Sequence, residues 1–285
     1  MSTPEEIEIV VPGLRLAARA WGPVDAPPML CLHGWLDNAA SFDLLLPLLS
    51  GRRFVALDLP GHGLSDHRGP GGTYGYLDTV ADTAMALHAL GWPRYGLLGH
   101  SLGAGVAALL AATFPDRVDA LVCIEGLGPM SEKAKHAPDR FAKAIRDQVE
   151  KADRRPVVHA SVDDAVARLG ASFARLSPAA ARVLCARGLV ATDGGVTWRT
   201  DPRLRWASRA RLVEDQVLAF LAAIRSPALL VRATKGLPLD NDELQARMRA
   251  VAHWQIAEVE GGHHVHLESP ERVAEPVARF LAEIP

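Results

Sequence analysis

Residues 99–103, which read G-H-S-L-G, constrain the fold of this chain more than any other stretch. They follow a short apolar run at 95–98 and precede a run of small, helix-forming residues at 104–114. A strand, a sharp turn and a helix in this order hold a serine hydroxyl exposed, where a base can reach it. We therefore predict a strand–turn–helix unit here, with Ser101 as a nucleophile. A serine that merely caps the helix is the alternative.

Short apolar strands alternate with amphipathic helices on both sides of this turn. We predict strands at 7–11, 14–20, 29–32, 54–57, 95–98, 120–124, 228–231 and 255–259, and helices at 42–49, 77–90, 104–114, 243–251 and 270–284. This alternation is typical of a mostly parallel sheet whose two faces are both covered by helices. The length of 285 residues suits one large α/β domain with an insert.

The segment 128–225 differs from the rest in pattern and in charge. It shows helix-like patterns and almost no strand-like runs. It holds 18 Lys and Arg against 11 Asp and Glu, whereas the remainder holds 13 against 22. We predict a core formed by 1–127 and 226–285, and a helical lid over the sheet formed by 128–225.

A nucleophilic serine needs a base and a group that orients the base. His263 stands directly after two glycines that follow the last predicted strand, where a loop can reach the serine turn. We predict His263 as the base. The alternative is that His263, His264 and His266 only cap the last helix, and we expect His266 to be structural, together with Glu268.

Developing negative charge on a substrate oxygen needs hydrogen-bond donors. The tripeptide H-G-W at 33–35 ends the predicted strand 29–32. A backbone N–H at this turn and the N–H that follows the serine are suited to that task, so we predict the amides of Trp35 and Leu102 as an oxyanion hole. Ordinary packing of the Trp35 ring is the alternative.

These motifs together resemble the α/β-hydrolase superfamily. They are 33–35, D-L-P-G-H-G-L-S at 58–65, the Ser101 turn and 262–270, in the usual order of that family. Residues 125–129, E-G-L-G-P, also resemble bacterial relatives of the serine hydrolase-like and kraken group. The resemblance implies an α/β-hydrolase fold, with a mostly parallel eight-stranded sheet, helices on both faces and a helical lid. It gives Asp58 and His62 a loop-shaping role.

The carboxylate partner of His263 departs from the commonest pattern of the family. Most members place an aspartate just after the strand that here ends near 233, and the expected position falls near Gly236. Members similar to haloalkane dehalogenases instead use a glutamate after the preceding strand, where this chain has Glu125. A carboxylate among apolar neighbours is costly to bury unpaired, so we expect Glu125 to meet an imidazole. Asp240 and Asp242 remain alternatives.

Composition narrows the possible partners and compartment. A formal net charge of −2 gives no reason to expect nucleic acid. No apolar run approaches the ~18 residues of a membrane span, and the acidic start lacks the apolar region of a signal peptide. The three cysteines are odd in number and widely spaced, as in a reducing compartment. We expect a cytoplasmic protein with no membrane partner, no cofactor and no metal, since no cysteine or histidine spacing is typical of a metal site.

The implied function is that of a serine hydrolase. It would cleave a carboxylic ester, or a related acyl bond, of a small and mostly apolar substrate through an acyl-enzyme intermediate. A lactonase, a carbon–carbon bond hydrolase or a cofactor-free perhydrolase would use the same residues. An alternative of another class is a non-catalytic protein that binds a small ligand under the lid. The serine argues against dehalogenase or epoxide hydrolase chemistry, for which resembling families use an aspartate.

The lid is expected to set specificity. Candidate pocket-lining residues are His33, Trp198 and Trp206, with Phe141 and Phe173, and plain packing is their alternative role. Lid arginines would attract an anionic substrate or simply face water. They include Arg154, Arg155, Arg203 and Arg205.

Overall fold

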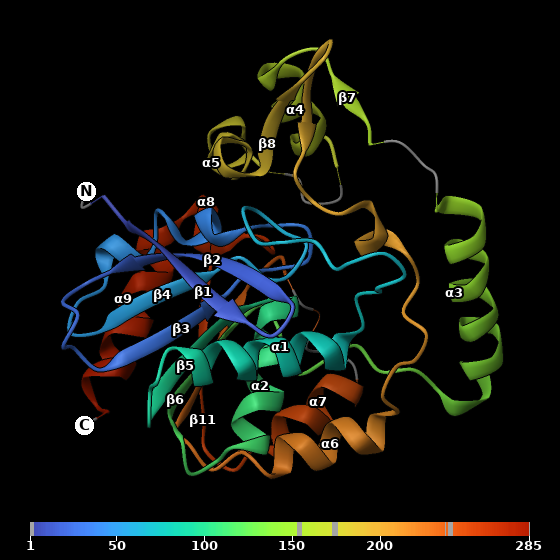
Figure 1. Ribbon diagram of the computed structural model, residues 1–285. Coiled ribbons are helices and arrows are strands. Elements are labelled where there is room, and N and C mark those ends of the chain that lie inside the picture. The colour runs from blue at the N-terminus through green and yellow to red at the C-terminus, as the bar shows by residue number, and fades with distance from the viewer. Residues whose placement is uncertain (1–2, 153–155, 173–175, 237, 239–241, 285) are drawn as a thin grey trace.

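An eight-stranded sheet forms the centre of the molecule. The computed structural model describes residues 3–152, 156–172, 176–236, 238 and 242–284 (Figure 1). The strands are β1 (Glu5–Val11), β2 (Leu14–Trp21), β3 (Pro28–Leu32), β4 (Arg53–Leu57), β5 (Tyr95–His100), β6 (Val118–Ile124), β10 (Ala228–Ala233) and β11 (Trp254–Val259). Their order in the sheet is β1-β2-β4-β3-β5-β6-β10-β11. The pairs β1–β2 and β2–β4 are antiparallel and the others are parallel. The sheet is thus mostly parallel, as predicted from the sequence.

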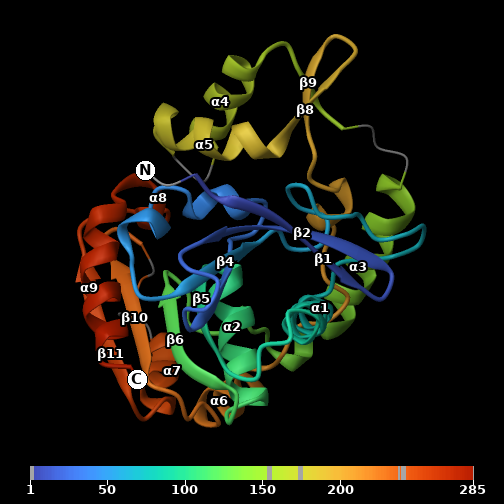
Figure 2. The ribbon, with the colours of Figure 1, turned by 60° about the vertical axis from the view of Figure 1, so that its left-hand side comes forward.

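Two hydrophobic cores lie on the two faces of this sheet. Successive residues of β3 point to opposite faces, so that Leu30 joins one core and Cys31 the other. The first core is covered by α1 (Tyr76–Ala89), α2 (Leu102–Thr113), α6 (Glu214–Ala222) and α7 (Asp242–Ala250). The second is covered by α8 (Val265–Glu268) and α9 (Pro270–Ala282). Figure 2 shows α9 on one side of the strands and α1 and α2 on the other.

The helix predicted at 42–49 is wrong. Two short 3₁₀ turns, η1 (Ala39–Phe42) and η2 (Leu46–Leu48), occupy this region. Pro47 has no N–H to donate and disfavours helical geometry at the residue before it, so a continuous α-helix cannot form. The apolar residues that suggested a helix are still buried against the sheet, as Phe42 and Leu45 are.

The insert contains more than helices. It comprises α3 (Ala137–Lys151), α4 (Val162–Gly170), α5 (Pro178–Gly188) and the 3₁₀ turns η3 (Ala134–His136) and η4 (Pro202–Arg205), together with a three-stranded sheet of β7 (Val158–His159), β9 (Gly195–Trp198) and β8 (Leu189–Thr192). Strands of two to four residues are too short to show an alternating pattern in the sequence. The elements α4, α5, β7 and β8 lie together above the main sheet (Figure 1).

The predicted end of the insert at 225 also changes. Helix α6 packs against α2 and α7. Its residues Val217 and Leu221 are fully buried in the first core. This helix therefore covers the sheet rather than forming part of a separate lid. Within the described residues no helix is both long and apolar enough to cross a bilayer.

Candidate active site

Ser101 lies on a strained turn between β5 and α2. Its backbone has φ 52° and ψ −112°, a conformation that residues with a side chain rarely adopt. A Cβ at Gly99 would stand 2.4 Å from the Ala104 nitrogen, and one at Gly103 would stand 2.0 Å from the Leu32 oxygen. The flanking glycines are thus required by space, and they let the start of α2 pack against the end of β3.

The structure brings Ser101, His263 and Glu125 into one hydrogen-bonded line. His263 Nε2 lies 2.9 Å from Ser101 Oγ. On the other side of the ring, His263 Nδ1 lies 3.2 Å from Glu125 Oε2. Since a carboxylate only accepts, the ring hydrogen sits on Nδ1, and Nε2 is left to accept the serine hydroxyl. The side chains thus have the order nucleophile, base and orienting carboxylate.

Glu125 is held rigidly at the end of β6. It is 1% exposed and has a left-handed φ of 51°. Its second oxygen, Oε1, accepts the Ala233 N–H at 2.6 Å. A buried carboxylate with these two donors is satisfied without a counter-ion from the insert.

Gly236 occupies the position where the common family pattern has an aspartate. A Cβ at this glycine would stand 1.9 Å from Glu125 Oε2. The carboxylate of Glu125 therefore fills the space that a side chain at 236 would use. Of the two alternatives for the acid, Asp242 is exposed at the start of α7 and Asp240 lies outside the described residues.

The turn that carries Trp35 lies beside the start of α2. Besides the Leu32 contact, a Cβ at Gly103 would stand 2.7 Å from the His33 oxygen, so the two predicted oxyanion donors, Trp35 and Leu102, come from adjoining segments. The Trp35 indole donates to the Leu204 carbonyl oxygen at 3.1 Å. The Arg205 guanidinium lies 5.9 Å from the centre of the same ring. The indole thus connects this turn to the insert.

Two buried neutral histidines shape the loops around this turn. His33 donates from Nδ1 to the Gly34 oxygen at 2.8 Å, and its Nε2 accepts the Leu59 N–H at 3.1 Å. His62 accepts the Leu36 N–H at Nε2, 3.2 Å away. Burial lowers the pKa of His33 to about 4 and that of His62 to about 3, so both rings stay neutral.

His33 is 0% exposed and both of its ring nitrogens are engaged by the backbone. Its predicted place in the substrate pocket is therefore wrong, and the side chain instead fixes the loop after β4.

Asp58 joins the core to the insert. Its carboxylate accepts the Ala39 N–H at 2.7 Å, the Leu64 N–H at 2.8 Å and the Nε of Arg187 at 2.8 Å. The Asp58 and Arg187 side chains are 0% and 1% exposed. Arg187 comes from α5, so a fully buried ion pair anchors the insert to the loop that follows β4. This arginine was not predicted from the sequence, because a charged residue on a helix normally faces water.

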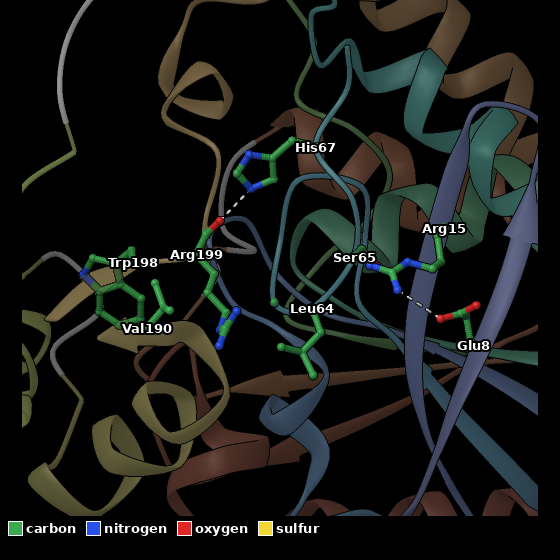
Figure 3. Close-up of a pocket in the computed structure, with 9 residues that line it drawn as sticks. Glu8, Arg15, Leu64, Ser65, His67, Val190, Trp198 and Arg199 are labelled. Carbon is green, nitrogen blue, oxygen red and sulfur yellow. Dashed lines mark hydrogen bonds and ion pairs between the residues drawn. The ribbon is translucent and has the colours of Figure 1, made fainter. Parts of the chain in front are cut away.

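One cavity of the described structure has a lining that does not include Ser101. It has a volume of about 590 Å³ and lies between the insert and the β1–β2 edge (Figure 3). Its lining consists of Glu8, Arg15, Gly63, Leu64, Ser65, His67, Val190, Trp198 and Arg199. Trp198 thus lines this cavity and packs within the insert, with its ring 6.5 Å from that of His159.

The other predicted lid residues are spread over the insert. Trp206 follows η4 and is half-buried, and Phe141 is 53% exposed on α3. Arg203 is engaged by Asp201 and by carbonyl oxygens of the 68–72 loop, so it is not free for a ligand. Phe173, Arg154 and Arg155 lie outside the described residues.

His266 and Glu268 have structural contacts. His266 Nε2 lies 2.6 Å from Ser41 Oγ, and Glu268 accepts the Ser177 N–H at 2.6 Å. Two further buried histidines, His100 and His264, meet Asp37 behind His263. This cluster was not predicted from the sequence, because its three residues come from three separate segments.

A mostly parallel sheet, a serine on the β5–α2 turn and a histidine after the last strand define the α/β-hydrolase class of proteins. Residues 27–270 match the family described as alpha/beta hydrolase fold, and the chain belongs to this family.

Curated relatives narrow the class to serine hydrolase-like proteins. The chain is 34% identical to a serine hydrolase-like protein of Danio rerio, over 97% of this chain and 88% of that one. It is 34% identical to serine hydrolase-like protein 2 of Homo sapiens, over 97% of this chain and 93% of that one. The chain is an α/β-hydrolase of the serine hydrolase-like kind.

Solved structures agree along the whole chain. A hypothetical protein from Pseudomonas aeruginosa PAO1 superimposes with a TM-score of 0.92 at 40% identity, covering 98% of both chains. The thioesterase domain from the curacin biosynthetic pathway has a TM-score of 0.86 at 26% identity, covering 99% of this chain and 100% of the other.

Proposed function

We propose that this chain hydrolyses a carboxylic ester, or a related acyl bond, of a small and mostly apolar molecule through an acyl-enzyme intermediate. The observation that carries the proposal is the line from Ser101 Oγ through His263 to Glu125, with separations of 2.9 and 3.2 Å. A hydroxyl becomes an effective nucleophile when a correctly oriented base accepts its proton. Here Ser101 carries the hydroxyl, His263 is the base and Glu125 orients the base.

The proposed reaction has two halves. In the first, Ser101 Oγ attacks the acyl carbon while His263 Nε2 takes its proton, and the amides of Trp35 and Leu102 stabilise the oxyanion. His263 then gives this proton to the leaving group, which departs and leaves an ester on Ser101. In the second half, His263 takes a proton from water, the hydroxide attacks the acyl carbon, and the proton returns to Ser101 as the acid leaves.

The proposed role of the insert is to cover this site. The buried pair Arg187–Asp58 joins the insert to the loop after β4, and the hydrogen bond from Trp35 to Leu204 joins it to the turn beside the start of α2. A cover that excludes water strengthens the electrostatic interactions beneath it. We therefore expect Trp206, which follows Leu204 closely, to influence acyl-chain preference more than the rate with acetate esters.

The test is hydrolysis of p-nitrophenyl esters of graded acyl length, with lactones and thioesters alongside. Thioesters are included because the curacin domain, to which the chain is similar, is a thioesterase. We expect saturable hydrolysis of at least one ester, and a loss of several orders of magnitude in kcat for Ser101→Ala. Ser131, a half-buried serine in the insert, gives the matched control Ser131→Ala, which should retain activity.

If only lactones are hydrolysed, the substrate is a lactone rather than an open-chain ester, and the proposed catalytic residues stay the same. Equal turnover by the wild type and Ser101→Ala would contradict the proposal. Binding of the substrates with no turnover would favour the non-catalytic alternative.

A further inference from the structure

Three buried donor atoms meet behind the His263 loop. They are Asp37 Oδ2, His100 Nδ1 and His264 Nε2, and all lie within 4.8 Å of one another. Asp37 Oδ2 lies 3.3 Å from His264 Nε2 and 3.6 Å from His100 Nδ1. The three residues are 7%, 0% and 6% exposed. No step of the proposed reaction uses them.

The hydrogen positions leave two of these atoms facing each other as acceptors. His100 Nε2 lies 2.8 Å from the His263 carbonyl oxygen, which can only accept, so the ring hydrogen of a neutral His100 sits on Nε2. Its Nδ1 then turns a lone pair toward the carboxylate of Asp37. Within the described part of the chain neither Asp37 Oδ2 nor His100 Nδ1 has a hydrogen bond of good geometry, and the nearest charged partner of Asp37 Oδ2 is the His264 ring at 3.3 Å. Two buried acceptors that face each other attract a cation.

Two of the separations among these atoms, those that involve Asp37 Oδ2, suit a tetrahedral metal ion. Bonds of about 2.0–2.2 Å from Zn²⁺ to nitrogen and oxygen place the ligand atoms of a tetrahedral site about 3.3–3.6 Å apart. The observed 3.3 and 3.6 Å are close to this separation, and 3.6 Å is too long for a hydrogen bond. The bond from His100 Nε2 to a carbonyl oxygen is also the outer contact that metal-bound histidines usually make.

Gly34 leaves room beside this cluster. A Cβ at this position would stand 2.8 Å from His100 Nδ1 and 3.0 Å from Asp37 Oδ2. Any larger residue would crowd the two donor atoms. The glycine therefore keeps open the side from which a fourth ligand, such as water, would approach.

We propose that Asp37, His100 and His264 form a binding site for a divalent transition-metal ion, best matched by Zn²⁺. Two imidazoles and one carboxylate favour zinc over magnesium or calcium, which prefer oxygen ligands. The spacing of residues along the chain gave no sign of this site because its ligands follow β3, end β5 and precede α8.

The bound ion would inhibit hydrolysis, a consequence that rests on the proposed function. The rings of His100 and His263 have centres 4.9 Å apart. A divalent ion held by Asp37 and His100 brings net positive charge close to His263. His263 must become positively charged when it takes the Ser101 proton, so the ion disfavours that step.

The binding test uses the full-length chain without a histidine tag, stripped of metal with a chelator. Zn²⁺ is titrated by calorimetry, and Co²⁺ is titrated while its visible absorption, which is intense in tetrahedral sites, is recorded. We expect one saturable site in the wild type. Affinity should fall by at least about tenfold in Asp37→Asn and in His264→Gln, and should be unchanged in His253→Gln, an exposed control histidine.

The absence of saturable Zn²⁺ binding by the folded wild type would overturn the proposal, as would wild-type affinity in both ligand variants. Circular dichroism verifies that the variants are folded.

The inhibition test adds the same Zn²⁺ concentrations to ester hydrolysis. We expect a dose-dependent loss of rate in the wild type and in His253→Gln that is relieved by chelator and absent in His264→Gln. Saturable Zn²⁺ binding without a loss of the hydrolysis rate would overturn the proposed inhibition but would support the metal site. If no ester is hydrolysed at all, the proposed function fails while the binding test still decides on the metal site.

Discussion

The position of Glu125 makes a relocation of the orienting carboxylate possible. Gly236 has no left-handed backbone, and its missing Cβ would point at Glu125 Oε2 from 1.9 Å. Removing the glutamate side chain with Glu125→Ala empties this space. An aspartate introduced by Gly236→Asp in the same chain would then present its carboxylate to His263 Nδ1 from the other strand.

The expected magnitudes follow from the contacts that are lost and restored. Glu125→Ala removes the group that keeps the hydrogen of His263 on Nδ1, and we expect kcat to fall by about 10³–10⁴, or about 4–5 kcal/mol. It also leaves the buried Ala233 N–H unpaired, which should cost about 1–3 kcal/mol of unfolding free energy. Gly236→Asp added to this variant should restore about tenfold to a hundredfold in kcat, since the charge returns without the Ala233 bond.

The assay is steady-state hydrolysis of the best p-nitrophenyl ester, with melting curves to verify folding. Glu125→Ala with Gly236→Asn is the matched control, because asparagine has the size of aspartate without its charge. Gly236→Asp in the wild-type chain should destabilise the fold, since two carboxylates would overlap. Equal recovery with aspartate and asparagine, or full activity of Glu125→Ala, would refute the assigned role of Glu125.

Three further predictions concern the base, the anchor of the insert and the buried histidines. His263→Ala should lower kcat by several orders of magnitude in ester hydrolysis without loss of folding, and near-normal turnover would show that another group is the base. Arg187→Met should reduce the free energy of unfolding in urea by about 3–5 kcal/mol, because Asp58 is left buried without its positively charged partner. Arg182→Met, on the exposed side of the same helix, should change this free energy by no more than about 0.5 kcal/mol. Equal effects of the two substitutions would mean that the buried pair is not an anchor. The pKa of His62 is lowered in the folded state, so the unfolded chain binds a proton first as the pH falls below about 6.5. The free energy of unfolding should therefore decrease on acidification by up to about 1.4 kcal/mol per pH unit. His62→Gln should flatten this slope in melting curves recorded at several pH values.

Local patterns were sufficient to predict the core of the fold. The inner strands of the main sheet, such as β3, β6 and β10, are short apolar runs. The glycines around Ser101 mark a turn in which backbone segments pack closely. Each of these segments can be recognised from the few residues around it, and their order along the chain then indicates the fold. Pro47 shows the limit of this reasoning, since apolar spacing suggested a helix that the proline prevents.

Contacts between distant segments were harder to predict. The choice between Glu125 and the two aspartates depended on where the loops that carry them lie relative to His263. The strongest indication in the sequence was that a glycine, Gly236, stands where most family members have an aspartate. The buried pair of Arg187 with Asp58 gave no such signal, because its two halves are 129 residues apart. The strands of the insert were also missed, because two to four residues cannot reveal a period of two.

The most direct test of the central claim is covalent labelling of the serine. The folded chain is treated with a fluorophosphonate, and the adduct is located by intact mass and peptide mapping. We predict one adduct, on Ser101, that forms rapidly in the wild type, slowly in His263→Ala and not at all in Ser101→Ala. A folded protein that takes up no label, or that carries it on another residue, would contradict the assignment of Ser101 as an activated nucleophile.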